Sequence, residues 1–213
     1  MGIAYRKKVD NDTEFALWKI EENADELYQQ LQLHDDEKAF IQQLSNSKRY
    51  LHWLGTRVLL RKMLNTEEYI DCKVDAYGKP YLTSLPYHIS LSHSFDYAGV
   101  MISKNKPVGI DIEKIEQKVE RIAHKFLRPD ELDFIQPENK VNHLYACWCA
   151  KEAVYKCYGR KEVSFVSHIF LDNFDCREAG SFHATIKKEV VDLNFKVEYM
   201  QFNGYMVGYA KEA

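Results

Sequence analysis

The order of expected helices and strands repeats once along the chain, and this repeat constrains the fold more than any other feature. Hydrophobic periodicity in the first half predicts strands at 2–9 and 14–20, helices at 23–33, 35–44 and 47–64, and strands at 69–74, 87–91 and 98–103. The second half is expected to hold a strand at 108–113, helices at 119–127, near Pro129 and at 141–158, and strands at 163–171, 181–188, 194–202 and 205–210. The chain therefore predicts an α+β fold of two similar α/β halves, residues 1–106 and 107–213, with a ligand site in the cleft between them.

Composition excludes several classes of protein. The 213 residues carry a net charge of -3, whereas a nucleic-acid binder normally shows a clear basic excess. No secretory leader is expected, and no apolar run comes near the roughly 20 residues that span a bilayer, so no membrane partner is expected. The five cysteines are an odd number without a zinc spacing, since Cys147 and Cys149 would face opposite sides of a helix. A reduced, cytoplasmic protein is expected.

Residues 108–113 read Val-Gly-Ile-Asp-Ile-Glu, and this segment carries the strongest chemical signal. On a strand, alternate side chains share a face, so the three aliphatic residues would be buried while Asp111 and Glu113 project together on the opposite face. Their spacing of about 7 Å suits one hard cation, and Mg²⁺ is usually held by one or two carboxylates and substrate phosphates. A solvated strand face with two unrelated acids is the alternative.

Residues 148–156 read Trp-Cys-Ala-Lys-Glu-Ala-Val-Tyr-Lys and are expected to be helical. Glu152 and Lys156 are then one turn apart on the same face. The pair could hold a metal and a phosphate, or it could be a surface ion pair worth about 0.3–0.5 kcal/mol.

Two further segments suit phosphate binding. Ser92-His93-Ser94 lies where a strand is expected to end, and a histidine among hydroxyls can donate to a phosphate. Basic side chains also gather on the helix at 47–64 and in the Gly78-Lys79-Pro80 turn, and arginine forks match phosphate geometry. They are Lys48, Arg49, Arg57, Arg61 and Lys79. Taken singly, an exposed histidine and a solvated helix face explain these features equally well.

Taken together and in this order, the segments resemble the long, single-chain Sfp type of 4′-phosphopantetheinyl transferase. The resemblance covers about residues 47–159 and rests on the Gly-x-Asp-x-Glu strand, the Trp-x-x-Lys-Glu-x-x-x-Lys helix, the Ser-His-Ser element and the Gly-Lys-Pro turn. One departure follows Lys156: the chain reads Cys-Tyr-Gly-Arg-Lys, where relatives often carry a second glycine.

The resemblance implies a role for each matching residue. Asp111, Glu113 and Glu152 would ligate Mg²⁺, and Lys156 would lie beside the bridging oxygen of coenzyme A, the co-substrate. The nucleotide and its phosphates would be held by the following side chains: Arg49, Lys79, Pro80, Ser92 and His93, with Asp111 and Lys156 beside them. Glu152 or Glu131, directly or through water, would be the base.

The resemblance also implies that the chain acts as a monomer on an acyl or peptidyl carrier protein, which would dock near residues 115–126. His124, Lys125 and Arg128 would face the acidic carrier. A magnesium-dependent phosphoester or nucleotide hydrolase, and a non-catalytic coenzyme A-binding module, remain the alternative functions.

Overall fold

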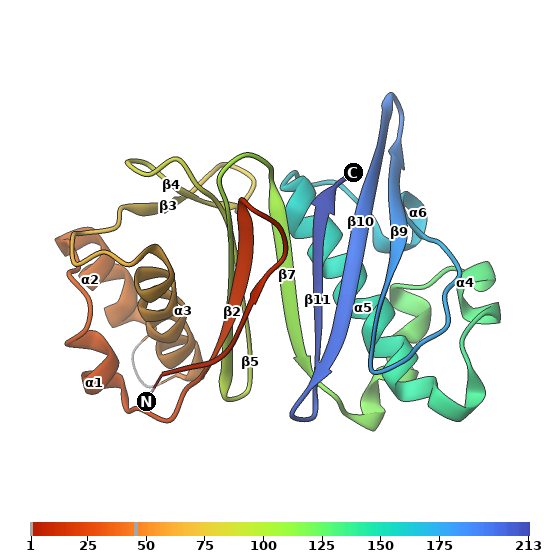
Figure 1. Cartoon of the computed structure of the whole chain (residues 1–213), viewed down its shortest axis with the longest axis horizontal. Helices are drawn as coiled ribbons and strands as arrows, with labels where there is room; N and C mark the ends of the chain where they lie inside the picture. Colours follow the sequence, from red (N-terminus) through yellow and green to blue (C-terminus); the bar gives the residue numbers. More distant parts are fainter. Residues whose placement is uncertain (1, 45–46) are drawn as a thin grey trace.

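Two antiparallel sheets lie side by side, and a long helix covers the outer face of each, as Figure 1 shows for the computed structural model of the chain. The structure describes residues 2–44 and 47–213. The first sheet has the order β1-β2-β6-β5, and its strands are β1 (Ile3–Lys8), β2 (Thr13–Lys19), β5 (His88–Ser94) and β6 (Tyr97–Ser103). The second has the order β7-β11-β10-β9-β8, and its strands are β7 (Val108–Lys114), β8 (Ile169–Leu171), β9 (Ala179–Lys188), β10 (Val191–Phe202) and β11 (Tyr205–Glu212). The pair β3 (Cys72–Val74) and β4 (Pro80–Leu82) forms a small separate sheet.

The helices lie on the outer faces of the two sheets. The first half contains α1 (Ala24–Tyr28), α2 (Asp35–Gln43) and α3 (Lys48–Leu64). The second half contains the 3₁₀ segments η1 (Gln117–Lys125) and η2 (Pro137–Asn139), and the helices α4 (Pro129–Asp133), α5 (Lys140–Tyr158) and α6 (Phe165–His168). No helix in the described ranges is long and apolar enough to cross a membrane.

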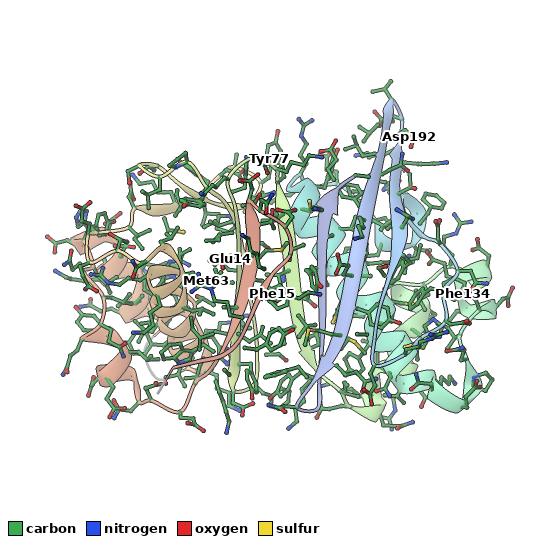
Figure 2. The ribbon with its side chains drawn as sticks, in the orientation of Figure 1. Glu14, Phe15, Met63, Tyr77, Phe134 and Asp192 are labelled. Carbon is green, nitrogen blue, oxygen red and sulfur yellow. The ribbon has the colours of Figure 1, made fainter. Side chains whose placement is uncertain are left out.

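Three apolar clusters hold these layers together. One lies between α3 and the first sheet, and another lies between α5 and the second sheet. The third joins the two sheets and includes Phe15 and Leu17 from β2 with Ile110 and Ile112 from β7, all 0% exposed. Figure 2 labels Phe15 at this junction. The apolar side of the 108–113 segment is therefore the surface through which the halves associate.

The other side of β7 lies under α5 at a distance that only glycine allows. A Cβ at Gly109 would come within 1.9 Å of the Ala153 carbonyl oxygen on α5. On the neighbouring strand β11, a Cβ at Gly208 would come within 2.8 Å of backbone and side-chain atoms of Cys149. The helix backbone thus rests directly on two strands of the sheet.

The structure confirms the α+β class and most expected elements, with differences in the short ones. The strand expected at 163–171 is wrong over its first part: residues 165–168 form α6, because Ser164 caps its first turn by accepting from the Ser167 N–H at 3.2 Å. The helix expected at 23–33 ends at Tyr28, and the one at 119–127 is a 3₁₀ segment. Strand β4 was not expected at all.

Gly109→Ala tests the close packing of α5 on β7. The added methyl group meets backbone that cannot move aside alone, so we expect a loss of about 1–3 kcal/mol in the free energy of unfolding, measured by urea denaturation. Gly99→Ala is the matched control, since a methyl group there meets only ordinary contacts of 3.4 Å or more. Equal stability of the two variants would contradict the packing argument.

Candidate functional site

Three of the residues singled out in the sequence lie in direct contact where β5, β7 and α5 meet. The Lys156 ammonium donates to Asp111 Oδ1 at 2.7 Å and to Ser92 Oγ at 3.0 Å. Ser92 donates to the same Asp111 oxygen at 2.9 Å. The first half supplies the serine, and the second half supplies the carboxylate and the cation. The site is therefore shared between the halves of one chain.

A row of hydroxyl groups fixes the two halves in register. Ser90, Ser92 and Ser94 alternate along β5, and their Oγ atoms accept from the N–H groups of Ile110, Ile112 and Lys114 at 3.0, 3.3 and 3.2 Å. These N–H groups lie on the edge of β7 that no strand of its sheet pairs, so the serines take the place of a neighbouring strand.

The same serines orient the carboxylates of β7. Ser94 donates to Glu113 Oε2 at 3.0 Å, as Ser92 does to Asp111. The side chains that present the carboxylates are thus held by the first half of the chain. This function of the serines was not recognised from the sequence, although their period of two can be read there.

Asp111 perturbs the other two candidate metal ligands, Glu113 and Glu152. Burial and then the Asp111 carboxylate raise the pKa of Glu152 to about 7, and the same two causes raise the pKa of Glu113. Burial opposes the charge on Lys156, but Asp111 outweighs it and raises the pKa of the ammonium. Carboxylates that disfavour one another's charge form a place where a cation is stabilised.

The residues present fit Mg²⁺. Asp111 Oδ2 is buried and has no hydrogen-bond partner in the structure, which leaves an oxygen available for a metal. Every candidate ligand is a carboxylate, and Mg²⁺ prefers oxygen. Across residues 2–44 and 47–213, however, no three His, Cys, Asp or Glu side chains already converge as a metal site. The Lys156 ammonium is the cation that contacts Asp111 here.

His93 is a neutral imidazole held by a second histidine. Burial and then the neighbouring His52 and Lys156 lower the pKa of His93 to about 4. The two rings stack with centroids 4.3 Å apart, and His52 Nε2 lies 2.6 Å from the Phe95 carbonyl oxygen. A carbonyl only accepts, so His52 carries its proton on Nε2. His52 thereby orients His93, a role that the sequence did not reveal.

A cavity of about 860 Å³ opens beside His93 on the first half. Arg49 and Pro80 line it, together with Trp53 and Arg57 from α3. The Arg57 guanidinium lies 4.9 Å from the Trp53 ring centre, and its Nε is buried without a partner. Arg61 does not line this cavity, and it donates instead to backbone carbonyls in the segment after α3, including that of Glu68 at 2.9 Å.

Lys79 spans the two halves. Its ammonium donates to the Cys157 carbonyl oxygen at 2.6 Å, at the end of α5, and burial lowers its pKa. Lys79 and Pro80 line a smaller cavity of about 150 Å³ that also includes Ser90 and Lys156. Pro80 borders both cavities, so the two spaces adjoin.

Glu131 lies apart from these residues. It forms a buried ion pair with Lys151 at 2.5 Å, and the two side chains are 3% and 0% exposed. Its oxygens also accept from the backbone N–H groups of Arg128 and Leu171, each at 2.9 Å. Lys151 donates in addition to two backbone carbonyls. No hydrogen bond or ion pair in the described part of the chain joins Glu131 to Asp111, Glu113 or Glu152.

The sequence of this chain is similar to those of known proteins. Residues 107–210 match the sequence model of the 4′-phosphopantetheinyl transferase superfamily. A 4′-phosphopantetheinyl transferase of Bacillus subtilis is 36% identical over 122 residues, which are 55% of this chain and 52% of that protein.

Two further relatives extend the comparison. The 4′-phosphopantetheinyl transferase gsp of Aneurinibacillus migulanus is 30% identical over 146 residues, 65% of this chain and 60% of its own length. The 4′-phosphopantetheinyl transferase AcpT of Escherichia coli K12 is 27% identical over 132 residues, 59% of this chain and 67% of its own. The matches to the first two relatives thus span about half to three fifths of those proteins.

Glu131→Gln tests whether the buried pair is structural. The substitution leaves the Lys151 ammonium buried opposite a neutral amide, so we expect a loss of about 3–5 kcal/mol in unfolding free energy by chemical denaturation. Glu138→Gln, on the exposed η2 segment, is the control for removal of a carboxylate. A Glu131→Gln protein as stable as the parent would exclude the structural role.

Proposed function

This chain belongs to the 4′-phosphopantetheinyl transferase superfamily, and we propose that it moves the 4′-phosphopantetheine group of coenzyme A onto a serine of an acyl or peptidyl carrier protein. The observation that carries the proposal is the contact of Ser92 and Lys156 with Asp111, beside Glu113, Glu152 and a cavity whose lining includes Arg49 and Arg57. This combination suits a pyrophosphate substrate, because metal-binding carboxylates and phosphate-binding cations adjoin.

Coenzyme A would lie along the two adjoining cavities. Arg49 and Arg57 would bind nucleotide phosphate groups in the larger one. His93, neutral at pH 7 because of its lowered pKa, would donate one hydrogen bond to a phosphate without adding charge. Lys79 and Ser92 would contact the coenzyme where the smaller cavity begins.

Asp111, Glu113 and Glu152 would hold Mg²⁺. When bound, the ion would supply positive charge to the pyrophosphate, where negative charge builds during transfer. Lys156 would then turn from Asp111 toward the coenzyme. Its raised pKa keeps it protonated at neutral pH, so it suits stabilisation of a departing oxygen.

In the transfer, the carrier serine Oγ forms a bond to the phosphorus that bears the pantetheine arm. The bond from that phosphorus to the bridging oxygen breaks, and 3′,5′-ADP leaves with the negative charge beside Lys156. The serine proton passes to a base, and Glu152 suits that task directly or through water that it orients. Glu131 would act indirectly in this scheme, by positioning α5 through Lys151.

Because both halves of one chain supply the site, we propose a monomer as the active unit. All five cysteines are free and buried thiols, which supports a reducing compartment such as the cytoplasm. The hydrolase and the non-catalytic coenzyme A-binding module would share the phosphate contacts, and they differ from the transferase in needing no carrier protein.

Magnesium binding is expected to depend on pH through Glu152. Its carboxyl group must lose a proton to bind the metal, and its pKa is raised to about 7, so Mg²⁺ affinity should fall roughly tenfold per pH unit below 7 and level off above it. Isothermal titration calorimetry from pH 5.5 to 8.5 would measure this. Glu152→Gln should bind more weakly with a flatter profile, and a parent profile without an inflection near 7 would contradict the assignment.

The reaction is tested by mass spectrometry of apo carrier proteins incubated with the enzyme, coenzyme A and Mg²⁺. We expect a mass gain of one phosphopantetheine that disappears with EDTA and falls at least a hundredfold in rate in Glu152→Ala. Release of 3′,5′-ADP without a carrier would support the hydrolase. Coenzyme A binding without either product would support the binding module.

A further inference from the structure

Phe95 occupies a position where the backbone disfavours it. It begins the two-residue turn between β5 and β6, and its φ is 50°, in the left-handed region. Such a conformation costs a residue other than glycine about 1–2 kcal/mol. The side chain is nonetheless 42% exposed. Neither local conformation nor core packing accounts for a phenylalanine here.

Three ammonium groups surround this exposed ring. Lys114 Nζ lies 4.4 Å from the ring centre, Lys48 Nζ lies 5.7 Å away and Lys118 Nζ lies 5.8 Å away. The lysines come from α3 in the first half and from β7 and η1 in the second. Each distance is within the range of cation–π attraction.

One of these three cations has an ion-pair partner in the described part of the chain. Lys118 forms an ion pair with Glu116. Within residues 2–44 and 47–213, Lys48 and Lys114 form no ion pair. By contrast, Arg128, which was expected to face the carrier protein, already forms an ion pair with Asp130 at 2.8 Å. An acidic partner would therefore gain more at the Phe95 ring than at Arg128.

Phe95, Lys48, Lys114 and Lys118 form a patch that adjoins the carboxylate cluster but does not reach the nucleotide cavity. Phe95 follows Ser94, which donates to Glu113, and Lys114 directly follows that carboxylate. None of the four patch residues lines the 860 Å³ or the 150 Å³ cavity. The patch thus lies on the Glu113 side of the carboxylate cluster.

We propose that the surface formed by Phe95, Lys48, Lys114 and Lys118 docks an acidic protein surface that presents an apolar side chain next to the acceptor hydroxyl. The inference rests on the proposed function, in which that protein is the carrier. Three separated amines match several carboxylates on a protein better than one phosphate group, and an exposed ring between them matches an apolar side chain.

Phe95→Gly and Lys118→Glu test the surface, with Lys187→Glu on the exposed face of β9 as the matched charge control. We expect the KM for an apo carrier protein to rise about tenfold in each patch variant, while kcat and the KM for coenzyme A stay within twofold. Glycine suits a positive φ, so Phe95→Gly should unfold at the same or higher denaturant concentration than the parent. A purely structural role for Phe95 would give the opposite stability result.

Two further outcomes would overturn the inference. One is an unchanged carrier KM in both patch variants while the parent transfers normally. The other is a rise in the KM for coenzyme A alone, which would assign the patch to the coenzyme. If the parent transfers to no carrier, the proposed function fails. Fluorescence anisotropy of labelled apo carrier then decides the docking question: tighter binding to the parent than to Phe95→Gly supports the surface, and equal or absent binding excludes it.

Discussion

The close approach of α5 to β7 is the constraint on which the rest of this structure depends. Without a side chain at Gly109, the Ala153 carbonyl can lie against the strand. The helix then carries Lys156 to within 2.7 Å of Asp111 and brings Glu152 close enough for that carboxylate to raise its pKa. The glycine of the Gly-x-Asp-x-Glu segment therefore has a geometric purpose, because any larger residue would move the helix away from the two carboxylates.

Groups from both halves of the chain offset the repulsion among the buried carboxylates around Asp111. Asp111 and Glu113 project from the same side of one strand, and each receives a serine hydrogen bond from the first half. Lys156 adds one positive charge, but Asp111 Oδ2 stays without a partner. The carboxylate cluster thus keeps an oxygen free to bind a further cation, while the serines and Lys156 stabilise it in the folded chain. A buried arrangement of this kind is typical of a functional site, since a core selected for stability alone would avoid it.

The parts of this architecture that follow from periodicity and local motifs could be read from the sequence. Alternation along 108–113 predicts which side chains are buried, and Val108, Ile110 and Ile112 are 0% exposed. Contacts between distant segments could not be read in this way. Nothing local shows that Glu131 pairs with Lys151, that His52 stacks on His93, or that three lysines approach Phe95. The capped turn at Ser164 was missed because Val163 and Phe165 mimic the pattern of a strand.

The serine row has a consequence for how the molecule assembles. Its hydroxyls complete the edge of β7 and, at the same time, bind the carboxylates beside it. A chain in which only one half has folded therefore lacks both a finished sheet edge and an ordered cluster. The serine row therefore couples the order of the carboxylate cluster to the docking of the two halves.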